Sequence, residues 1–193
     1  MSLREKVKEM VGEDELDPTE ISNLILDELD IPALSAEDKA FLEEFTNLEK
    51  LAMNKTSLTS TANFPDAPKL ARIELNENGL SGKELKTFAK YKALKTLKFA
   101  GNNVEDYKDL ECLKGLAELS NINLVDNPVS ELDDYTKTMF KMFPNLEVLD
   151  GADKEGNEVL SEADDEDDEY GEEYGDEGEF IEEDGEMDPE TIK

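Results

Sequence analysis

One apolar pattern returns along this 193-residue chain, and it constrains the fold more than any other feature of the sequence. Each full copy has apolar residues at its first, fourth, sixth and eleventh positions, with asparagine or threonine at the ninth. The full copies begin at Leu48, Leu70, Leu94 and Leu119, and degenerate copies begin at Ile21 and Leu146. Successive copies start 22 to 27 residues apart. A unit this short cannot bury its own apolar residues, so neighbouring copies must stack on one another.

This spacing is typical of leucine-rich repeats, in which every copy adds one short strand to a parallel sheet on the concave face. Between the strands, apolar residues at helical spacing predict helices or helical turns on the convex face. These residues are Leu85, Phe88 and Ala89 in one copy and Leu110, Leu113 and Leu116 in the next. Pro65 and Pro68 predict an irregular connection over 59–69. The predicted fold class is therefore α/β, a curved leucine-rich repeat solenoid.

The ninth position of each copy lies where the chain turns out of its strand. Asparagine occupies it at Asn78, Asn102 and Asn127, whereas Thr56 occupies it in the first full copy. A side-chain amide there can bond to backbone groups of adjacent turns that would otherwise be buried without partners. A hydroxyl offers fewer hydrogen bonds, so we expect the turn at Thr56 to be looser.

Both ends of the solenoid need covers, because the terminal repeats would otherwise expose their leucines. An apolar stripe at the N-terminus is made by Leu3, Val7, Met10 and Val11. The run Asp17-Pro18-Thr19-Glu20 predicts a helix start with a capping box, and Ser35-Ala36-Glu37-Asp38 predicts a second. A C-terminal helix is predicted from the spacing of Leu132, Tyr135, Met139, Phe140 and Phe143. The expected organisation is an N-terminal cap over 1–45, repeats over 46–130, a C-terminal cap over 131–156 and an acidic tail over 157–193.

The C-terminal segment 161–193 carries eighteen carboxylates against one lysine. Its self-repulsion and low apolar content predict disorder, because such a segment cannot offset the entropy of ordering. It could serve only to keep the chain soluble. Alternatively, its carboxylates pair with basic partners while its aromatic rings cover apolar patches or stack on guanidinium groups. The expected contact residues are Asp164, Asp165, Glu166, Asp167, Asp168, Glu169, Tyr170, Tyr174, Phe180 and Ile181.

Composition excludes several classes of function. A net charge of −31 repels the phosphates of nucleic acids and anionic membranes, so direct binding to either is not expected. Histidine is absent, which removes the usual general base and the commonest zinc ligand. We therefore expect no enzyme activity, cofactor or metal site. The charged N-terminus lacks the apolar core of a signal peptide, and Cys112 is the only cysteine, so an intracellular protein without disulfides is expected.

Two further surfaces can be predicted from the repeat register. The outward positions of the strands form a mixed, amide-rich face that suits protein contact or an ordinary solvated sheet equally well. Its expected contact residues are Lys50, Arg72, Asn76, Lys98, Asn121 and Asn123. A run of lysines, with only Glu84 as an acid among them, comprises Lys83, Lys86, Lys90, Lys92, Lys95 and Lys98. At α-helical spacing Lys83, Lys86 and Lys90 share one face, which is either a solvated exterior or a docking site for an acidic partner or for the tail.

With these residues identified, the chain resembles the acidic leucine-rich nuclear phosphoprotein family. The resemblance rests on Asp17-Pro18, the Leu58-Thr59-Ser60 turn, the repeats, the acidic tail, and the block from Asp133-Asp134-Tyr135 to Leu149-Asp150-Gly151. Similar C-terminal caps close other nuclear repeat proteins, including a spliceosomal subunit. Two features depart from the family, because the tail is short and ends in Glu190-Thr191-Ile192-Lys193 without a basic import signal.

The resemblance implies a monomeric, nuclear protein, with shuttling to the cytoplasm left open. It implies histone binding and chaperoning, regulation of chromatin acetylation, inhibition of protein phosphatase 2A, and adaptor roles in messenger RNA export. Core histones or other basic proteins are the expected partners of the tail. Ser161 precedes Asp164 by three residues, a spacing that acidophilic kinases prefer, so it is a candidate phosphorylation site.

Overall fold

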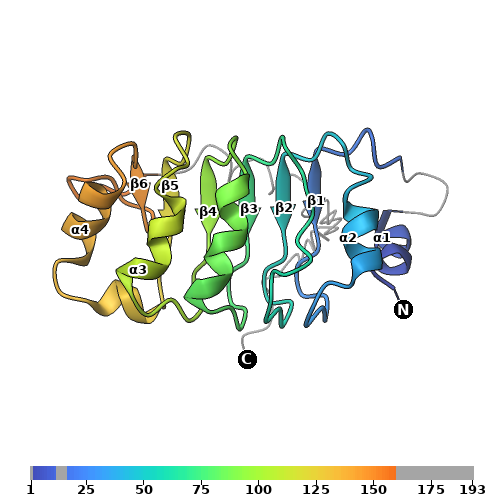
Figure 1. Ribbon diagram of the computed structural model, residues 1–193, viewed down its shortest axis with the longest axis horizontal. Coiled ribbons are helices and arrows are strands. Elements are labelled where there is room, and N and C mark those ends of the chain that lie inside the picture. The colour runs from blue at the N-terminus through green and yellow to red at the C-terminus, as the bar shows by residue number, and fades with distance from the viewer. Residues whose placement is uncertain (1, 12–16, 160–193) are drawn as a thin grey trace, which may run out of the picture. The chain divides into compact units, whose positions relative to one another are not determined.

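Short parallel strands stacked in sequence order form the sheet of this protein (Figure 1). The computed structural model describes residues 2–11 and 17–159. The strands are β1 (Asn23–Ile25), β2 (Lys50–Ala52), β3 (Arg72–Glu74), β4 (Thr96–Lys98), β5 (Asn121–Asn123) and β6 (Val148–Leu149). All pair in parallel. Both degenerate copies of the apolar pattern thus supply strands, which confirms the predicted leucine-rich repeat fold.

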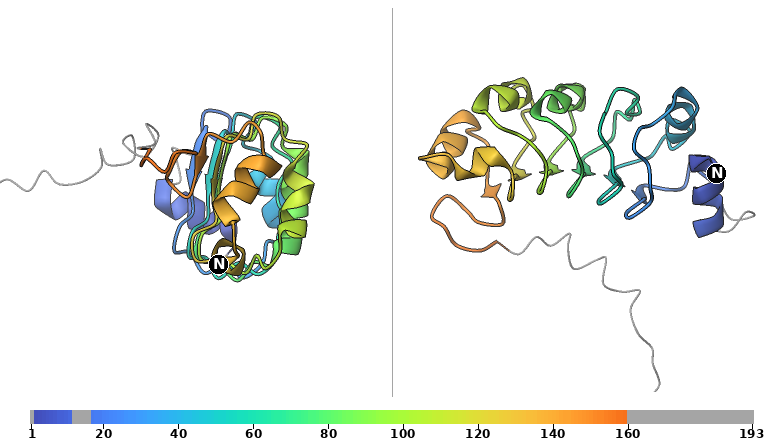
Figure 2. Two further views of the ribbon diagram at one scale, coloured as in Figure 1. Left: turned by 90° about the vertical axis from the view of Figure 1, so that its left-hand side faces the viewer. Right: turned by 90° about the horizontal axis from the view of Figure 1, so that it is seen from below.

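Helices and turns cover the opposite face of the sheet (Figure 2, right). They are α2 (Ala36–Leu42), η1 (Gly82–Lys90), α3 (Tyr107–Leu110), η2 (Glu111–Leu113) and η3 (Pro128–Glu131). The segment 59–69 is irregular, as its two prolines predict. The η elements are 3₁₀ helices, which rise about 2.0 Å per residue against about 1.5 Å in an α-helix. A 3₁₀ helix therefore spans the return distance with fewer residues, which suits short repeats.

Aromatic side chains fill the convex half of the core where the irregular segment has no helix. Phe64, from that segment, packs edge-on against Phe88 of η1 with ring centroids 5.4 Å apart. Phe88 also meets Phe99, which follows β4, at 6.3 Å. The Tyr91 hydroxyl donates a hydrogen bond to the carbonyl oxygen of Pro65. The residues 1–160 form one compact unit, and this unit contains the whole described core.

The asparagines at the ninth position join each repeat to its neighbours, as predicted. The amide of Asn127 donates to the carbonyl of Phe99 (2.9 Å), and its oxygen accepts from the amide of Val104 (3.0 Å). Asn102 bonds in the same way to Leu75 (2.8 Å) and Leu80 (3.2 Å). These bonds connect coils that lie more than twenty residues apart in the chain.

The turn at Thr56 is closed, contrary to the expectation that it would be looser. Thr56 is fully buried, and Asn78 of the next repeat reaches back to it. The Asn78 side-chain oxygen accepts from the backbone amides of Thr56 (3.1 Å) and Leu58 (2.9 Å). The Leu58 bond is the counterpart of those that Asn102 and Asn127 accept, and the Thr56 hydroxyl lies within hydrogen-bond distance of the Asn78 oxygen (3.0 Å) and the Met53 carbonyl oxygen (3.1 Å).

The N-terminal cap differs in two ways from its prediction. The first helix, α1 (Leu3–Val11), buries Leu3 and Val7, but Met10 is 55% exposed. The segment expected to start a helix at Asp17 is instead a short turn, in which the Asp17 carboxylate accepts from the Thr19 amide (2.9 Å). Because β1 begins only a few residues later, no helix fits there. The second predicted capping box, Ser35 with Asp38, is confirmed at the start of α2.

The C-terminal cap is built by α4 (Tyr135–Met142) and the turns after β6. The backbone amide of Asp150 donates to the carbonyl of Ile122 (2.9 Å). The backbone amide of Val159 donates to the carbonyl of Gly151 (2.8 Å). The Asp150 carboxylate accepts from the amide of Leu124 (2.6 Å), and burial raises the pKa of this carboxyl. These contacts cover the end of the last repeat.

The expected tail, 157–193, lies outside the described residues apart from 157–159, so its border and its disorder stay predictions. None of the helices in the described ranges is long and apolar enough to cross a membrane.

Replacing Asn127 with alanine should lower the free energy of unfolding by about 1–3 kcal/mol, because it leaves the buried Val104 amide without an acceptor. Asn103→Ala is the matched control, since that side chain is exposed and its amide donates to the exposed Glu105 (3.2 Å). Urea denaturation measures both variants. Equal losses would contradict a special role for the buried amide.

Asp150→Asn should stabilise the protein at neutral pH. A raised folded-state pKa means that the stability from the carboxyl is present below the unfolded pKa and is lost as the pH rises through the folded pKa. The variant should therefore unfold with a higher free energy at about pH 7 and lose this advantage toward about pH 4. Asp153→Asn should behave oppositely, because hydrogen bonds from Asn157 lower the pKa of Asp153. Denaturation across this pH range tests both signs, and parallel curves would refute the assignment.

Candidate protein-binding face

The outward positions of the strands form cross-strand rows on the concave face. The register places Lys50, Arg72, Thr96 and Asn121 in one row. It places Ala52, Glu74, Lys98 and Asn123 in the next row. A third row, just beyond the strands, contains Asp27, Asn54, Asn76, Ala100 and Val125. All six contact residues predicted from the sequence thus lie on this one face, and their role in binding stays a prediction.

Glu74 forms ion pairs with two basic side chains on this face. Its carboxylate lies 2.5 Å from the Arg72 Nε and 3.8 Å from the Lys50 Nζ. Both Glu74 and Lys50 are only 8% exposed. Lys50 and Arg72 are therefore positioned by an ion-pair cluster, rather than extended into solvent as isolated charges. Glu74 is an outward strand position that was not predicted as a contact residue, although its register opposite Ala52 places it diagonally across from Lys50.

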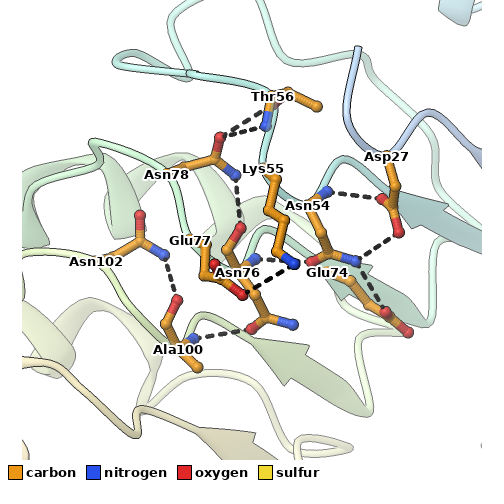
Figure 3. Close-up of polar contacts among 10 residues, drawn as sticks. All are labelled: Asp27, Asn54, Lys55, Thr56, Glu74, Asn76, Glu77, Asn78, Ala100 and Asn102. Atoms are coloured by element: carbon orange, nitrogen blue, oxygen red, sulfur yellow. Dashed lines mark hydrogen bonds and ion pairs between the residues drawn. The ribbon is translucent and has the colours of Figure 1, made fainter. Parts of the chain in front are cut away.

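The third row is a ladder of side-chain amides that crosses the first repeats (Figure 3). The Asn54 side chain donates to the Asp27 carboxylate (2.9 Å) and accepts from the backbone amide of Asn76 (2.8 Å). The Asn76 oxygen in turn accepts from the amide of Ala100 (2.9 Å). Asn76 therefore has a structural role, and its NH₂ group is the part that suits a partner. Asp27 and Asn54, which share the register of Asn76, were not among the predicted contact residues, and Asp27 was not recognised as part of this face.

The ladder ends where the asparagine is replaced by apolar residues. Ala100 and Val125 occupy the corresponding positions in the later repeats, and Val125 is 39% exposed. The Asn123 side chain accepts from the amide of Val125 (3.1 Å). The concave face is thus charged near β2 and β3, whereas near β5 it combines the amides of Asn121 and Asn123 with the exposed Val125, a mixture that suits a protein partner better than a small polar ligand.

The remaining predicted sites are in the C-terminal acidic segment. The ten tail residues expected to contact partners and the phosphorylation candidate Ser161 lie outside the described residues. Within the described ranges, no group of three or more acidic or cysteine side chains is arranged to hold a metal ion.

Comparison with known proteins shows that this chain matches a leucine-rich repeat family. Residues 39–158 match the family model described as Leucine-rich repeat. An acidic leucine-rich nuclear phosphoprotein 32-related protein from Plasmodium falciparum is 32% identical over 171 residues, which cover 83% of this chain and 61% of the relative. A protein from Tetrahymena thermophila that is named as a histone is 35% identical over 118 residues, which cover 61% of this chain and 30% of that protein. The chain therefore spans less than two thirds of the length of either relative.

The fold is also found in a solved complex. A chain in the crystal structure of the Drosophila melanogaster SNF/U2A' complex is 25% identical, with a TM-score of 0.55. The similarity covers 80% of this chain and 91% of that one. The likeness therefore extends to nearly the whole of the solved repeat chain.

Glu74→Gln should lower the free energy of unfolding by about 1–3 kcal/mol, because it removes the negative charge that holds Arg72 and Lys50 while keeping the side-chain shape. Glu77→Gln is the control, since the Glu77–Lys55 pair (3.6 Å) is largely exposed and should contribute below about 0.5 kcal/mol. Chemical denaturation distinguishes the two. An equal loss of stability in both variants would show that the Glu74 ion pairs stabilise the fold no more than an exposed ion pair does.

Proposed function

Because this chain belongs to the leucine-rich repeat family, we propose that it is a non-enzymatic scaffold that binds basic nuclear proteins. We propose core histones as the main partners, which makes the protein a histone-binding chaperone and chromatin regulator. One observation carries this proposal: eighteen carboxylates against one lysine follow directly on a repeat unit that is capped at its C-terminal end. The acidic segment supplies the binding chemistry, and the repeat unit supplies a rigid platform.

The names of the relatives support a chromatin setting. One relative is named as a nuclear phosphoprotein and another as a histone. We therefore propose a nuclear location for this chain. Ser161 is the proposed phosphorylation site, where a phosphate would deepen the negative charge that is already present.

The chemistry of the acidic segment fits a partner that also binds DNA. Carboxylates form charge-assisted hydrogen bonds with lysine and arginine side chains, as DNA phosphates do. The segment can therefore shield histone charge and block premature contact with DNA. The repeat unit itself has thirty-three acidic and nineteen basic residues, so its long-range field also favours encounter with cationic proteins.

Tyr170, Tyr174, Phe180 and Ile181 add apolar contacts within this acidic segment. Repulsion between the carboxylates would be enough to keep the chain soluble without these apolar residues. In the proposed complex, the rings cover apolar patches of the histone or stack on arginine guanidinium groups.

A second candidate function is that of an adaptor in RNA processing, which binds another protein through the concave face. The likeness to a repeat chain solved in the SNF/U2A' complex favours it. The mixed charged, amide and apolar composition of the concave face is compatible with such a partner. Inhibition of protein phosphatase 2A, implied by the family resemblance, stays a prediction.

Removing the acidic segment separates these functions. We expect the full chain to bind core histones at least about tenfold more tightly than residues 1–160 at about 0.15 M salt, with strong weakening as salt rises. Fluorescence anisotropy with labelled histones measures both affinities. The shortened chain keeps the whole described core, and its circular dichroism spectrum checks the fold.

Equal affinities of the two chains, or affinity that is insensitive to salt, would rule out the charge-based mechanism. A second full-length variant with Tyr170, Tyr174 and Phe180 changed to serine keeps the charge and tests the apolar contribution. A partner held by the concave face would instead bind the full and shortened chains alike.

A further inference from the structure

The helix η1 has three distinct faces, because it is a 3₁₀ helix over all nine of its residues. In a 3₁₀ helix the side chains at positions i and i+3 lie directly above one another. One face contains Gly82, Leu85 and Phe88 and is buried in the core. Lys83 and Lys86 therefore share a second face, whereas Lys90 belongs to the third. This corrects the α-helical expectation that placed these three lysines together.

The third face of η1 is occupied by contacts with the preceding repeat. The Glu84 carboxylate accepts from the backbone amide of Thr61 (2.7 Å) and from its hydroxyl (2.8 Å). The Lys90 Nζ lies 2.5 Å from the Asp66 carboxylate and 3.2 Å from the carbonyl oxygen of Phe64. The acid within the lysine run is thus bound to a threonine and does not neutralise the lysines beside it.

The second face presents lysines that form no ion pairs within the described residues. Lys83 and Lys86 are exposed, and neither forms a hydrogen bond or an ion pair with any residue of the described ranges. Asp109 of the next repeat packs against Gly82 but makes no ion pair with either lysine in the same part of the chain. Lys92 and Lys95, just beyond η1, are also exposed. We call these four the lysine strip: Lys83 and Lys86 share a face of η1, and Lys92 and Lys95 follow shortly after them in the chain.

We propose that the lysine strip docks an extended acidic segment of a partner protein. The 3₁₀ rise places Lys83 and Lys86 about 6 Å apart along the helix axis. In an extended chain, side chains on one face recur every second residue, about 6.6 Å apart. Carboxylates at alternate positions of such a segment therefore match the spacing of the lysines.

The net negative charge of the whole chain limits which acidic ligands can bind to the strip. The net charge of −31 repels every anion at a distance, but at about 0.15 M salt the screening length is about 8 Å. Contacts with the strip then govern the binding of a short segment. Duplex DNA carries one negative charge per about 1.7 Å over its whole length. The acidic protein therefore repels it more strongly than it repels a short peptide segment. The strip therefore favours a short acidic protein segment over nucleic acid.

This site is separate from the proposed function, because its ligand has the opposite charge to a histone. A chain that holds a basic protein with its acidic segment has a second, chemically different surface for an acidic partner. Binding of both partners to one chain would make the protein a bridge between them.

Binding of a fluorescent peptide of alternating aspartate and serine to the full chain tests the proposal. We expect Lys83→Glu with Lys86→Glu to weaken this binding at least about tenfold at about 0.15 M salt, as measured by anisotropy. The matched control is Lys137→Glu with Lys141→Glu, two exposed lysines of α4, which changes the net charge equally. The control should stay within about twofold of the original chain. Thermal melts verify that both double variants stay folded.

Three results would overturn the proposal. Equal weakening in both double variants would assign the effect to the overall field, and unchanged binding in the first would remove the strip from the contact. Tighter binding of a single-stranded oligonucleotide to the same lysines would make the strip a phosphate site. Peptide binding that appears only with residues 1–160 would assign the strip to the chain's own C-terminal segment. None of these results depends on histone binding, so the two proposals fail independently.

Discussion

Hydrogen bonds from side-chain amides to buried backbone groups are the interaction on which the rest of this structure depends. Each coil turns sharply out of its strand, and the backbone groups at that turn have no water to bond with. Asn102 and Asn127 bridge to the preceding coil and fix its distance and orientation. Asn78 bridges in the same way to the coil that contains Thr56, and it also accepts from the Thr56 amide. Once the coils are held in this register, their leucines can pack into one shared core.

The same stacking decides how polar residues meet on the two faces. On the concave side, parallel pairing brings Lys50 opposite Arg72, and Ala52 opposite Glu74, so charges from separate repeats gather into one cluster. On the convex side, Glu84 and Lys90 are bound to the preceding repeat through Thr61 and Asp66. Lys83 and Lys86 are left facing solvent. Charged residues that are close in sequence therefore have different environments, because some bind to the preceding repeat and others face solvent.

This separation of charge links the fold to the proposed functions. A rigid platform with a mixed concave face, a strip of lysines and an acidic extension offers different chemistry to different proteins. The acidic extension suits basic nuclear proteins, and the lysine strip suits an acidic one. Neither needs a catalytic group, which is consistent with a chain that lacks histidine.

Local patterns in the sequence were sufficient to predict the repeats, the positions of the strands, the capping box at Ser35 and the C-terminal helix that begins at Tyr135. These features depend on residues that are close together in the chain, so periodicity records them directly. The prediction of a helix start at Asp17 was wrong, because β1 begins only a few residues later, and Met10 of the predicted apolar stripe is 55% exposed. Composition alone determined the strongly acidic character of the protein.

Tertiary structure decided which polar residues meet. The pairing of Glu74 with Lys50, and of Asn54 with Asp27, joins residues that are more than twenty positions apart, so it depends on the register between coils. The segment Gly82–Lys90 folds as a 3₁₀ helix instead of an α-helix, which places Lys90 on a different face from Lys83 and Lys86. The sequence by itself thus determined the repeating unit and its charge, whereas only the stacking of the units decided which charges are paired and which face solvent.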